Sequence, residues 1–187
     1  MNIITPTRRP KPKAVPGHWT ICESPIGPLT LFGGPSSLRA IHFPGRAGVL
    51  EEGSRDDAAL AGAVAQLQEY FAGTRQRFEL ALDLRGTQFQ QSVWSELLAI
   101  PFGATTTYGT IADRLGRRDR VRAVGAAVGR TPVPIIVPCH RVLGAGGELT
   151  GYGGGLQRKQ ALLDLESAVS GGEPAPGVWA GRQLPLL

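Results

Sequence analysis

The segment best equipped for chemistry is residues 135–142, where an apolar run leads directly into a cysteine, a histidine and an arginine. A cysteine acts as a nucleophile only as the thiolate, so a reactive cysteine needs a base or a positive charge close by. His140 and Arg141 supply one of each beside Cys139. Glu166, on a helical stretch further along, could orient the imidazole. A buried cysteine that acts as a small hydrophobic residue is the alternative interpretation.

The chain of 187 residues contains only two cysteines and three histidines. That supply is too small for a disulfide framework and thin for a closed tetrahedral zinc site. We therefore expect reduced thiols in the cytoplasm, with no metal and no cofactor. Cys22 has no base or arginine beside it, so we expect a buried structural residue there. His18 and His42 are expected on the surface or as satisfied core residues.

A cluster of arginines forms a second constellation, in a chain with a formal charge of +5 and a pI of about 9.8. A solvated helix face would explain such a cluster without any function. A DNA-facing helix-turn-helix explains it better, because phosphates and bases are approached at the turn and at the start of the second helix. Ala123 and Ala126 are small enough to permit close approach of the backbone to a groove. The cluster consists of Arg114, Arg117, Arg118, Arg120, Arg122 and Arg130.

The first half of the chain has a strand-like pattern followed by a helical one. The Pro-Ile-Gly-Pro sequence at 25–28 is turn chemistry between two short apolar runs. Gly73 is placed to stop the helix. In chain order, we expect strands within 18–43, a loop over 45–55, a helix over 56–71 and an extended segment over 78–84.

The second half is more helical. Thr87 can cap a helix that Pro101 and Gly103 end. Two short helices, over 107–115 and 119–128, are separated by a tight turn at Gly116 and resemble a helix-turn-helix unit. A last helix is expected over 157–167.

These elements predict an α/β fold, with a small N-terminal αβ domain followed by a mostly helical C-terminal domain with a helix-turn-helix. No apolar stretch approaches the roughly 20 residues that span a bilayer, and the N-terminus lacks the apolar core of a secretory signal. We expect no membrane partner. The predicted parts are a disordered basic arm over 1–16, the first domain over 17–84, the second over 85–170 and a tail over 171–187.

Two long stretches resemble the O6-alkylguanine-DNA alkyltransferase family. They are IPFGATTTYGTIADRLG and RAVGAAVGRTPVPIIVPCHRVLGAGGELTGYGGGLQRKQALLDLE. The strong resemblance covers residues 87–166, and SPIGPLTL with YFAG extends it weakly across the first half. PCHRV together with RAVG at this spacing is very specific.

The resemblance implies repair of DNA by direct reversal, in which Cys139 accepts an alkyl group from O6-alkylguanine and also from O4-alkylthymine. His140 resembles the base that acts on Cys139 through a water, and Glu166 the carboxylate that orients it. Tyr108 resembles the phenol that rotates a phosphate and assists protonation of guanine. Arg122 resembles the arginine that fills the place of the extruded base.

The remaining implied roles concern DNA and the substrate pocket. The carbonyls of Cys139 and Val142 would accept bonds from the guanine amino group, and the loop around Tyr152 and Gly153 would cover the base. The base must leave the duplex to react, and the resulting thioether has no easy hydrolytic exit, so each molecule should act once. We further assign Arg118, Arg120, Thr107, Ala123 and Ala126 to the DNA surface, and Thr131 and Arg141 to the pocket. The expected partner is duplex DNA containing O6-alkylguanine, bound by a monomer.

Thr131 departs from the family pattern, which usually has Asn before the proline of NPxPxxxPCHR. The departure bears on the rate of transfer more than on its occurrence. The main alternative is a non-enzymatic binder that resembles the alkyltransferase-like proteins and flags alkylated guanine for other repair factors. Those proteins replace the reactive cysteine, whereas Cys139 is intact. A regulator with an added zinc domain and a cysteine hydrolase fit the sequence less well.

Overall fold

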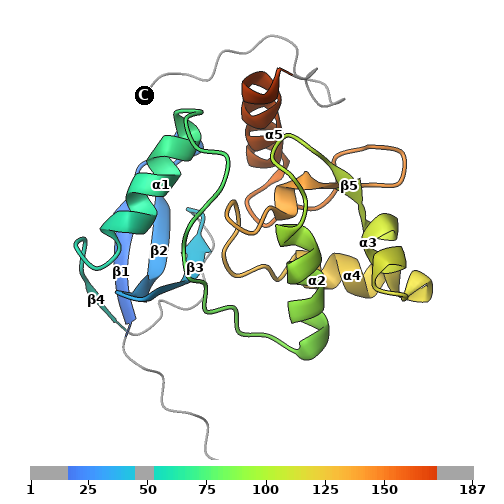
Figure 1. The fold of residues 1–187 in the computed structure, drawn as a ribbon, viewed down its shortest axis with the longest axis horizontal. Helices are drawn as coiled ribbons and strands as arrows, with labels where there is room; N and C mark the ends of the chain where they lie inside the picture. Colours follow the sequence, from blue (N-terminus) through green and yellow to red (C-terminus); the bar gives the residue numbers. More distant parts are fainter. Residues whose placement is uncertain (1–16, 45–52, 172–187) are drawn as a thin grey trace, which may run out of the picture.

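The computed structural model describes residues 17–44 and 53–171 (Figure 1). The predicted arm, all but the first residue of the predicted tail and most of the predicted loop at 45–55 lie outside the described residues.

The first half contains a four-stranded sheet in the order β3-β2-β1-β4. The strands β1, β2 and β3 form an antiparallel meander, as the strand pattern over 18–43 predicts. The turn expected at 25–28 joins β1 to β2, and Gly27 adopts a φ of 97° there, which a glycine accepts without strain. The strands span Gly17–Cys22 (β1), Leu29–Gly34 (β2), Ser37–His42 (β3) and Gly53–Arg55 (β4).

The loop prediction is wrong at its end, because β4 pairs in parallel with β1. All three β4 residues are exposed, so no alternation of apolar side chains signals this strand. A Cβ atom at Gly53 would collide with the Gly17 carbonyl oxygen, so the pairing itself requires glycine. The strand is therefore specified by backbone contact rather than by a hydrophobic pattern.

Helix α1 (Ala61–Phe71) begins five residues later than predicted, because the preceding residues form turns. Asp56 accepts a bond from the Ala59 amide, which closes one of these turns. The helix ends before Gly73, whose φ of 75° confirms the expected stop. The extended segment expected over 78–84 lies along the free edge of β3, where Leu38 exchanges backbone bonds with Ala81 and Asp83.

Between residues 85 and 171, the described part of the second half, there are four α-helices. Helix α2 (Gln88–Leu98) begins at Thr87, whose side chain forms a capping box with Gln90, as expected. The predicted helix over 107–115 is α3 (Tyr108–Arg114), capped by Thr107. The predicted helix over 119–128 is in fact a 3₁₀ turn, η1 (Arg118–Arg120), followed by α4 (Val121–Val128).

The last helix, α5 (Leu156–Ser170), extends beyond the predicted 157–167 at both ends. A second 3₁₀ turn, η2 (Cys139–Arg141), leads into β6 (Val142–Leu143). This strand pairs with β5 (Thr106–Thr107) in a two-residue ladder that is too short to show any periodicity in the sequence.

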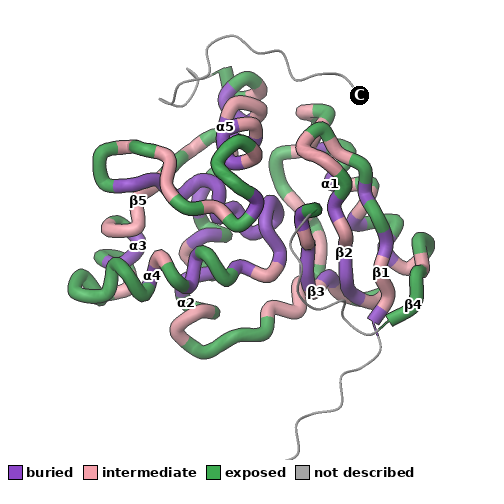
Figure 2. Tube along the Cα trace, turned by 180° about the vertical axis from the view of Figure 1, so that it is seen from behind, coloured by how far each residue is buried: buried purple, intermediate pink, exposed green. Residues whose placement is uncertain are grey.

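The two halves share one hydrophobic core, to which the sheet, α1, α2, α3 and α4 all contribute. Residues 133–143 are buried throughout and run through the middle of the molecule between the sheet and the C-terminal helices (Figure 2). The Ile41 amide of β3 donates to the Pro132 carbonyl over 2.9 Å, which ties this segment to the sheet. No helix among residues 17–44 and 53–171 is long and apolar enough to cross a membrane.

Candidate active site and arginine surface

A tight buried loop delivers Cys139 to its position. The Val137 amide donates to the Val133 carbonyl over 2.9 Å, which closes the loop. At its apex Ile135 has a φ of 76°, a conformation that is strained for a β-branched residue. Such strain persists only where the surroundings enforce it, and it is common at functional sites. Because Ile135 is fully buried, the core supplies that enforcement.

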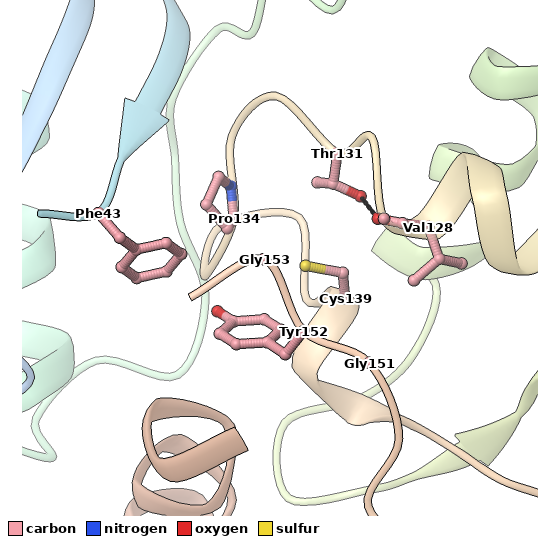
Figure 3. A pocket seen from close by; sticks show the side chains of 9 residues that line it. Phe43, Val128, Thr131, Pro134, Cys139, Gly151, Tyr152 and Gly153 are labelled. Carbon is pink, nitrogen blue, oxygen red and sulfur yellow. Dashed lines mark hydrogen bonds between the residues drawn. The ribbon is translucent and has the colours of Figure 1, made fainter. Parts of the chain in front are cut away.

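Cys139 is 7% exposed and opens on a small pocket between the two halves of the molecule (Figure 3). The pocket's cavity volume is about 10 Å³, room for about one water molecule. The rings of Tyr152 and Phe43 form one wall, with their centroids 5.6 Å apart. Phe43 follows β3, so the N-terminal half takes part in the site. The lining residues are Phe43, Val128, Gly129, Thr131, Pro134, Cys139, Gly151, Tyr152 and Gly153.

The Glu166 carboxylate, 1% exposed, is the centre of a buried hydrogen-bond network. One oxygen, Oε1, lies 2.8 Å from His140 Nε2 and accepts bonds from Tyr70 Oη at 2.7 Å and from Arg141 at 2.8 Å. The other, Oε2, accepts from Arg141 Nε at 2.8 Å and from the Gly103 amide at 3.0 Å. The contact between His140 and Glu166 that the sequence suggested is therefore present.

This network fixes the protonation states around His140. Burial opposes the charge on Glu166, but its hydrogen bonds to His140 and Arg141 and its electrostatic attraction to these two side chains outweigh burial and lower its pKa to about 2. Burial lowers the pKa of His140, against the opposing attraction of Glu166. A neutral imidazole that donates from Nε2 to the carboxylate carries its lone pair on Nδ1. Nδ1 is buried and has no hydrogen-bond partner within the described ranges.

Lys159 is a buried charge that the sequence analysis missed. It is fully buried on α5 and donates to the carbonyls of Val142 and Thr150. Burial lowers its pKa to about 8, while attraction to Cys139 acts in the opposite direction. The signal was present in the sequence, because Lys159 shares the buried face of α5 with Leu162 and Glu166 at helical spacing.

The pocket residues expected from the sequence divide into two groups. Thr131, Tyr152 and Gly153 line the pocket with Cys139, whereas Arg141 and Val142 are absent from its lining. Placing the Arg141 side chain in the pocket is therefore wrong. Its guanidinium binds Glu166 and the Ile100 carbonyl, as a buried cation requires partners.

The Val142 carbonyl, expected to accept a bond from guanine, accepts one from Lys159. Tyr108 begins α3 outside the pocket lining, and its hydroxyl lies 3.4 Å from Thr150 Oγ1. The Thr107 hydroxyl accepts from the Thr110 amide over 3.1 Å.

The arginine surface is an exposed face formed by η1 and the start of α4, at the edge of the molecule far from the sheet (Figures 1 and 2). An open hollow there is lined by Arg120, Arg122 and Ala123, together with Asp119 and Val121. Ala126 is also exposed. Arg118 pairs with Asp113 at 2.6 Å and Arg120 with Asp119 at 3.8 Å, while Arg114 of the same cluster lies 3.8 Å from Glu96 on α2. Exposed pairs of this kind contribute about 0–1 kcal/mol.

Among residues 17–44 and 53–171, no group of three or more His, Cys, Asp or Glu side chains could hold a metal ion. Cys22 is 1% exposed, and burial raises the pKa of its thiol, in keeping with the structural role expected for it.

Fold and site together define a class of protein, one with a buried cysteine beside a polarised histidine and, on the same half, an arginine-rich helical surface. The family model for the ribonuclease-like domain of 6-O-methylguanine DNA methyltransferase matches residues 18–84, and the model for its DNA binding domain matches residues 88–168. The chain belongs to the 6-O-methylguanine DNA methyltransferase family.

Individual relatives agree with this assignment. The methylated-DNA–protein-cysteine methyltransferase of Mycobacterium tuberculosis is 52% identical over 157 residues, covering 81% of this chain and 93% of the relative. Its counterpart in Methanosarcina acetivorans is 44% identical, covering 81% and 99%. The crystal structure of M. tuberculosis OGT in complex with DNA is similar, with a TM-score of 0.77 and 51% identity, covering 81% of this chain and 94% of that one.

Proposed function

We propose that this protein repairs DNA by direct reversal and transfers the alkyl group of O6-alkylguanine, or of O4-alkylthymine, to Cys139 in one irreversible turnover. The observation that carries the proposal is the position of Cys139, which opens on a pocket beside the buried pair of His140 and Glu166. Family membership supports it, because relatives that are up to 52% identical are named for this reaction.

The chemistry is a displacement at carbon. His140, with its lone pair on Nδ1, takes the thiol proton of Cys139 through a water, and Glu166 stabilises the resulting imidazolium. The sulfur–carbon bond then forms as the bond from carbon to guanine O6 breaks, and the electron pair stays on guanine. Tyr108 assists protonation of the departing guanine. The products are S-alkylcysteine and unmodified guanine, and the alkylated sulfur cannot react again.

The damaged base must enter the pocket from the duplex, which requires it to be flipped out of the stack. A cavity of about 10 Å³ does not admit a purine, so the segment from Gly151 to Gly153 must move as the base enters. Carbonyl groups of Cys139 and Val142 would then accept bonds from the guanine amino group. Tyr152 would cover the base.

Helices α3 and α4 serve as a helix-turn-helix in this proposal. Arg118 and Arg120 bind phosphates, and Arg122 fills the gap left in the stack. Thr107, Ala123 and Ala126 lie where the backbone of the DNA approaches. The protein acts as a monomer. It works in the cytoplasm, because a thiol nucleophile needs a reducing compartment.

The experiment that tests the proposal is mass spectrometry of the protein after incubation with excess duplex DNA containing O6-methylguanine. We expect one added methyl group, on the peptide that contains Cys139, and no further turnover. Cys139→Ser should bind the damaged duplex and accept nothing. A label on Cys22, repeated turnover, or tight binding without any transfer would contradict the proposal, and the last result would favour the non-enzymatic binder.

A further inference from the structure

The N-terminal half contacts the hydrogen-bond network around Glu166 through Tyr70. Tyr70 lies on α1, is completely buried, and donates its hydroxyl to Glu166 Oε1 over 2.7 Å. The two residues are 96 positions apart in the chain and belong to different halves of the molecule. Glu166 Oε1 is the same oxygen that pairs with His140 Nε2. Tyr70 and His140 therefore both contact the same carboxylate oxygen, and the Tyr70 bond acts directly on the partner of His140.

The surroundings of Tyr70 hold its hydroxyl in this position. Its ring packs between Phe71 and Phe78, each with a centroid distance of 5.4 Å, and against Phe102 at 6.0 Å. Phe102 in turn lies under the Arg141 guanidinium at 5.7 Å. Burial raises the pKa of Tyr70 well above its usual value, and the negative charge of Glu166 adds to that effect. The phenol thus keeps its proton at neutral pH and remains a hydrogen-bond donor to Glu166.

We propose that Tyr70 is a positioning residue for the alkyl transfer, which fixes Glu166 Oε1 opposite His140 Nε2 and so keeps the histidine lone pair on Nδ1. The inference rests on the proposed function, because it assigns Tyr70 to the relay that activates Cys139. It makes the N-terminal half a working part of the active site rather than a separate module.

Arg141 donates to both oxygens of Glu166 and the Gly103 amide donates to Oε2, so the C-terminal half already holds the carboxylate by several bonds. The Tyr70 bond adds a donor from α1 of the N-terminal half to Oε1, the oxygen that faces His140 Nε2, and so holds that oxygen from a second part of the molecule. The same bond also withdraws electron density from Oε1, which weakens the carboxylate as a partner for a protonated His140. Tyr70 therefore affects both the geometry and the basicity of the relay.

The test is Tyr70→Phe, which removes one hydroxyl and keeps the buried ring. Single-turnover transfer should slow about three- to tenfold, the rate equivalent of one hydrogen bond, and equally for duplex DNA and for free O6-benzylguanine. DNA affinity should not change. Phe78→Leu is the matched control, because it disturbs packing on the same ring and leaves the hydrogen bond to Glu166 in place.

A second measurement separates positioning from general loosening. Among the described residues, Glu166, Arg141 and Lys159 act on the His140 imidazole. Cys139 interacts with Lys159, and Tyr70 and Tyr152 interact with Glu166. Tyr70→Phe removes one of these groups, leaves the others in place and strengthens Glu166 as an acceptor. The pKa of His140, followed through its ¹⁵N chemical shifts, should therefore rise, and the acidic limb of the rate profile should move to higher pH with it. Phe78→Leu should shift neither.

The inference is overturned if Tyr70→Phe matches the wild type in rate and in the His140 titration, or if Phe78→Leu reproduces both changes. The two proposals fail in different ways. A wild-type protein that transfers nothing from either substrate defeats the proposed function. The titration of His140 needs no turnover and would still report whether Tyr70 governs the Glu166–His140 pair.

Discussion

Arg141 and Arg122 are the same residue type on the same half of the molecule, yet the protein holds their charges in opposite ways. Arg141 is 6% exposed and divides its donors between both oxygens of Glu166 and the Ile100 carbonyl. Arg122 lies on the exposed arginine surface, lining an open hollow at the start of α4. The Arg141 guanidinium is bound within the protein, whereas the Arg122 guanidinium is exposed and accessible to a binding partner.

The difference shows how this fold separates stability from binding. A buried ion pair that loses one partner leaves an uncompensated charge and costs about 3–5 kcal/mol, whereas an exposed pair contributes about 0–1 kcal/mol. Substitutions in the centre around Glu166 should therefore lower stability together with activity. Substitutions on the arginine surface should affect the binding and repair of DNA and leave the stability of the protein unchanged.

The largest effect should follow Glu166→Gln, which keeps the size of the side chain and removes the charge that balances Arg141. We expect the free energy of unfolding, measured with urea, to fall by about 3–5 kcal/mol. Glu69→Gln is the matched control, since Glu69 pairs with Arg75 at 2.6 Å on the surface. It should cost less than about 1 kcal/mol. Equal losses in the two variants would erase the distinction between the buried and exposed charges.

Lowering the pH should remove the same buried charge without a mutation, because it protonates Glu166, and the protein should then lose stability. The pKa of Glu166 is about 2 in the folded protein, against about 4.3 for an unperturbed glutamate. Its contribution is therefore complete above the unfolded value and disappears as the pH falls toward 2. The difference amounts to about 3 kcal/mol of stability. Urea unfolding between pH 6 and pH 2 should show this loss in the wild type, and the loss should be smaller in Glu166→Gln. Parallel curves for the two proteins would assign the acid sensitivity to other groups.

On the exposed side, Arg122→Ala should slow repair of duplex DNA about tenfold or more, the equivalent of one charge-assisted hydrogen bond. The reaction with free O6-benzylguanine should be unchanged, because only the duplex requires base extrusion. Stability should stay within about 0.5 kcal/mol of the wild type. Arg55→Ala on β4 removes the same charge from the other half and serves as the control. Equal slowing on both substrates would show that Arg122 acts on the chemistry instead.

The sequence was most informative where a structural feature depends on residues that are close together in the chain. Helix α2 was predicted together with its Thr87 cap, because a cap and a helical repeat both operate within a few residues. The resemblance placed Cys139, His140 and Glu166 in one site, and the structure brings the histidine and the carboxylate into contact.

The parts that were missed depend on contacts between distant segments. Tyr70 belongs to the YFAG segment of the weak resemblance, which assigned it no role, and Phe43 stands in no quoted motif. Each reaches the site only because the two halves share a core. Arg141 was misplaced for a related reason. Adjacency to Cys139 in the chain does not fix the direction of a side chain, and a buried guanidinium goes where acceptors are, here Glu166.

The smallest effect concerns Thr131, which lies between the arginine surface and the buried centre. Its hydroxyl donates to the Val128 carbonyl at the end of α4 over 2.7 Å, and its side chain lines the pocket with Cys139 (Figure 3). An Asn there could make the same donation from its amide nitrogen, and that nitrogen carries a second donor that the Thr hydroxyl lacks, so Asn offers one donor more than Thr.

Because a net hydrogen bond is worth about 0.5–1.5 kcal/mol and about 1.4 kcal/mol is tenfold in rate, we expect Thr131→Asn to speed alkyl transfer by up to about tenfold. The extra bond would hold the link between α4 and the Cys139 loop more firmly and leave the phosphate-binding arginines untouched. DNA affinity should therefore stay the same while the single-turnover rate rises. Thr131→Val keeps the shape but removes the existing bond, so it should slow transfer. If Asn leaves the rate unchanged or lowers it, the bond from Thr131 to Val128 already holds the link, and the departure from the family pattern is compensated within this chain.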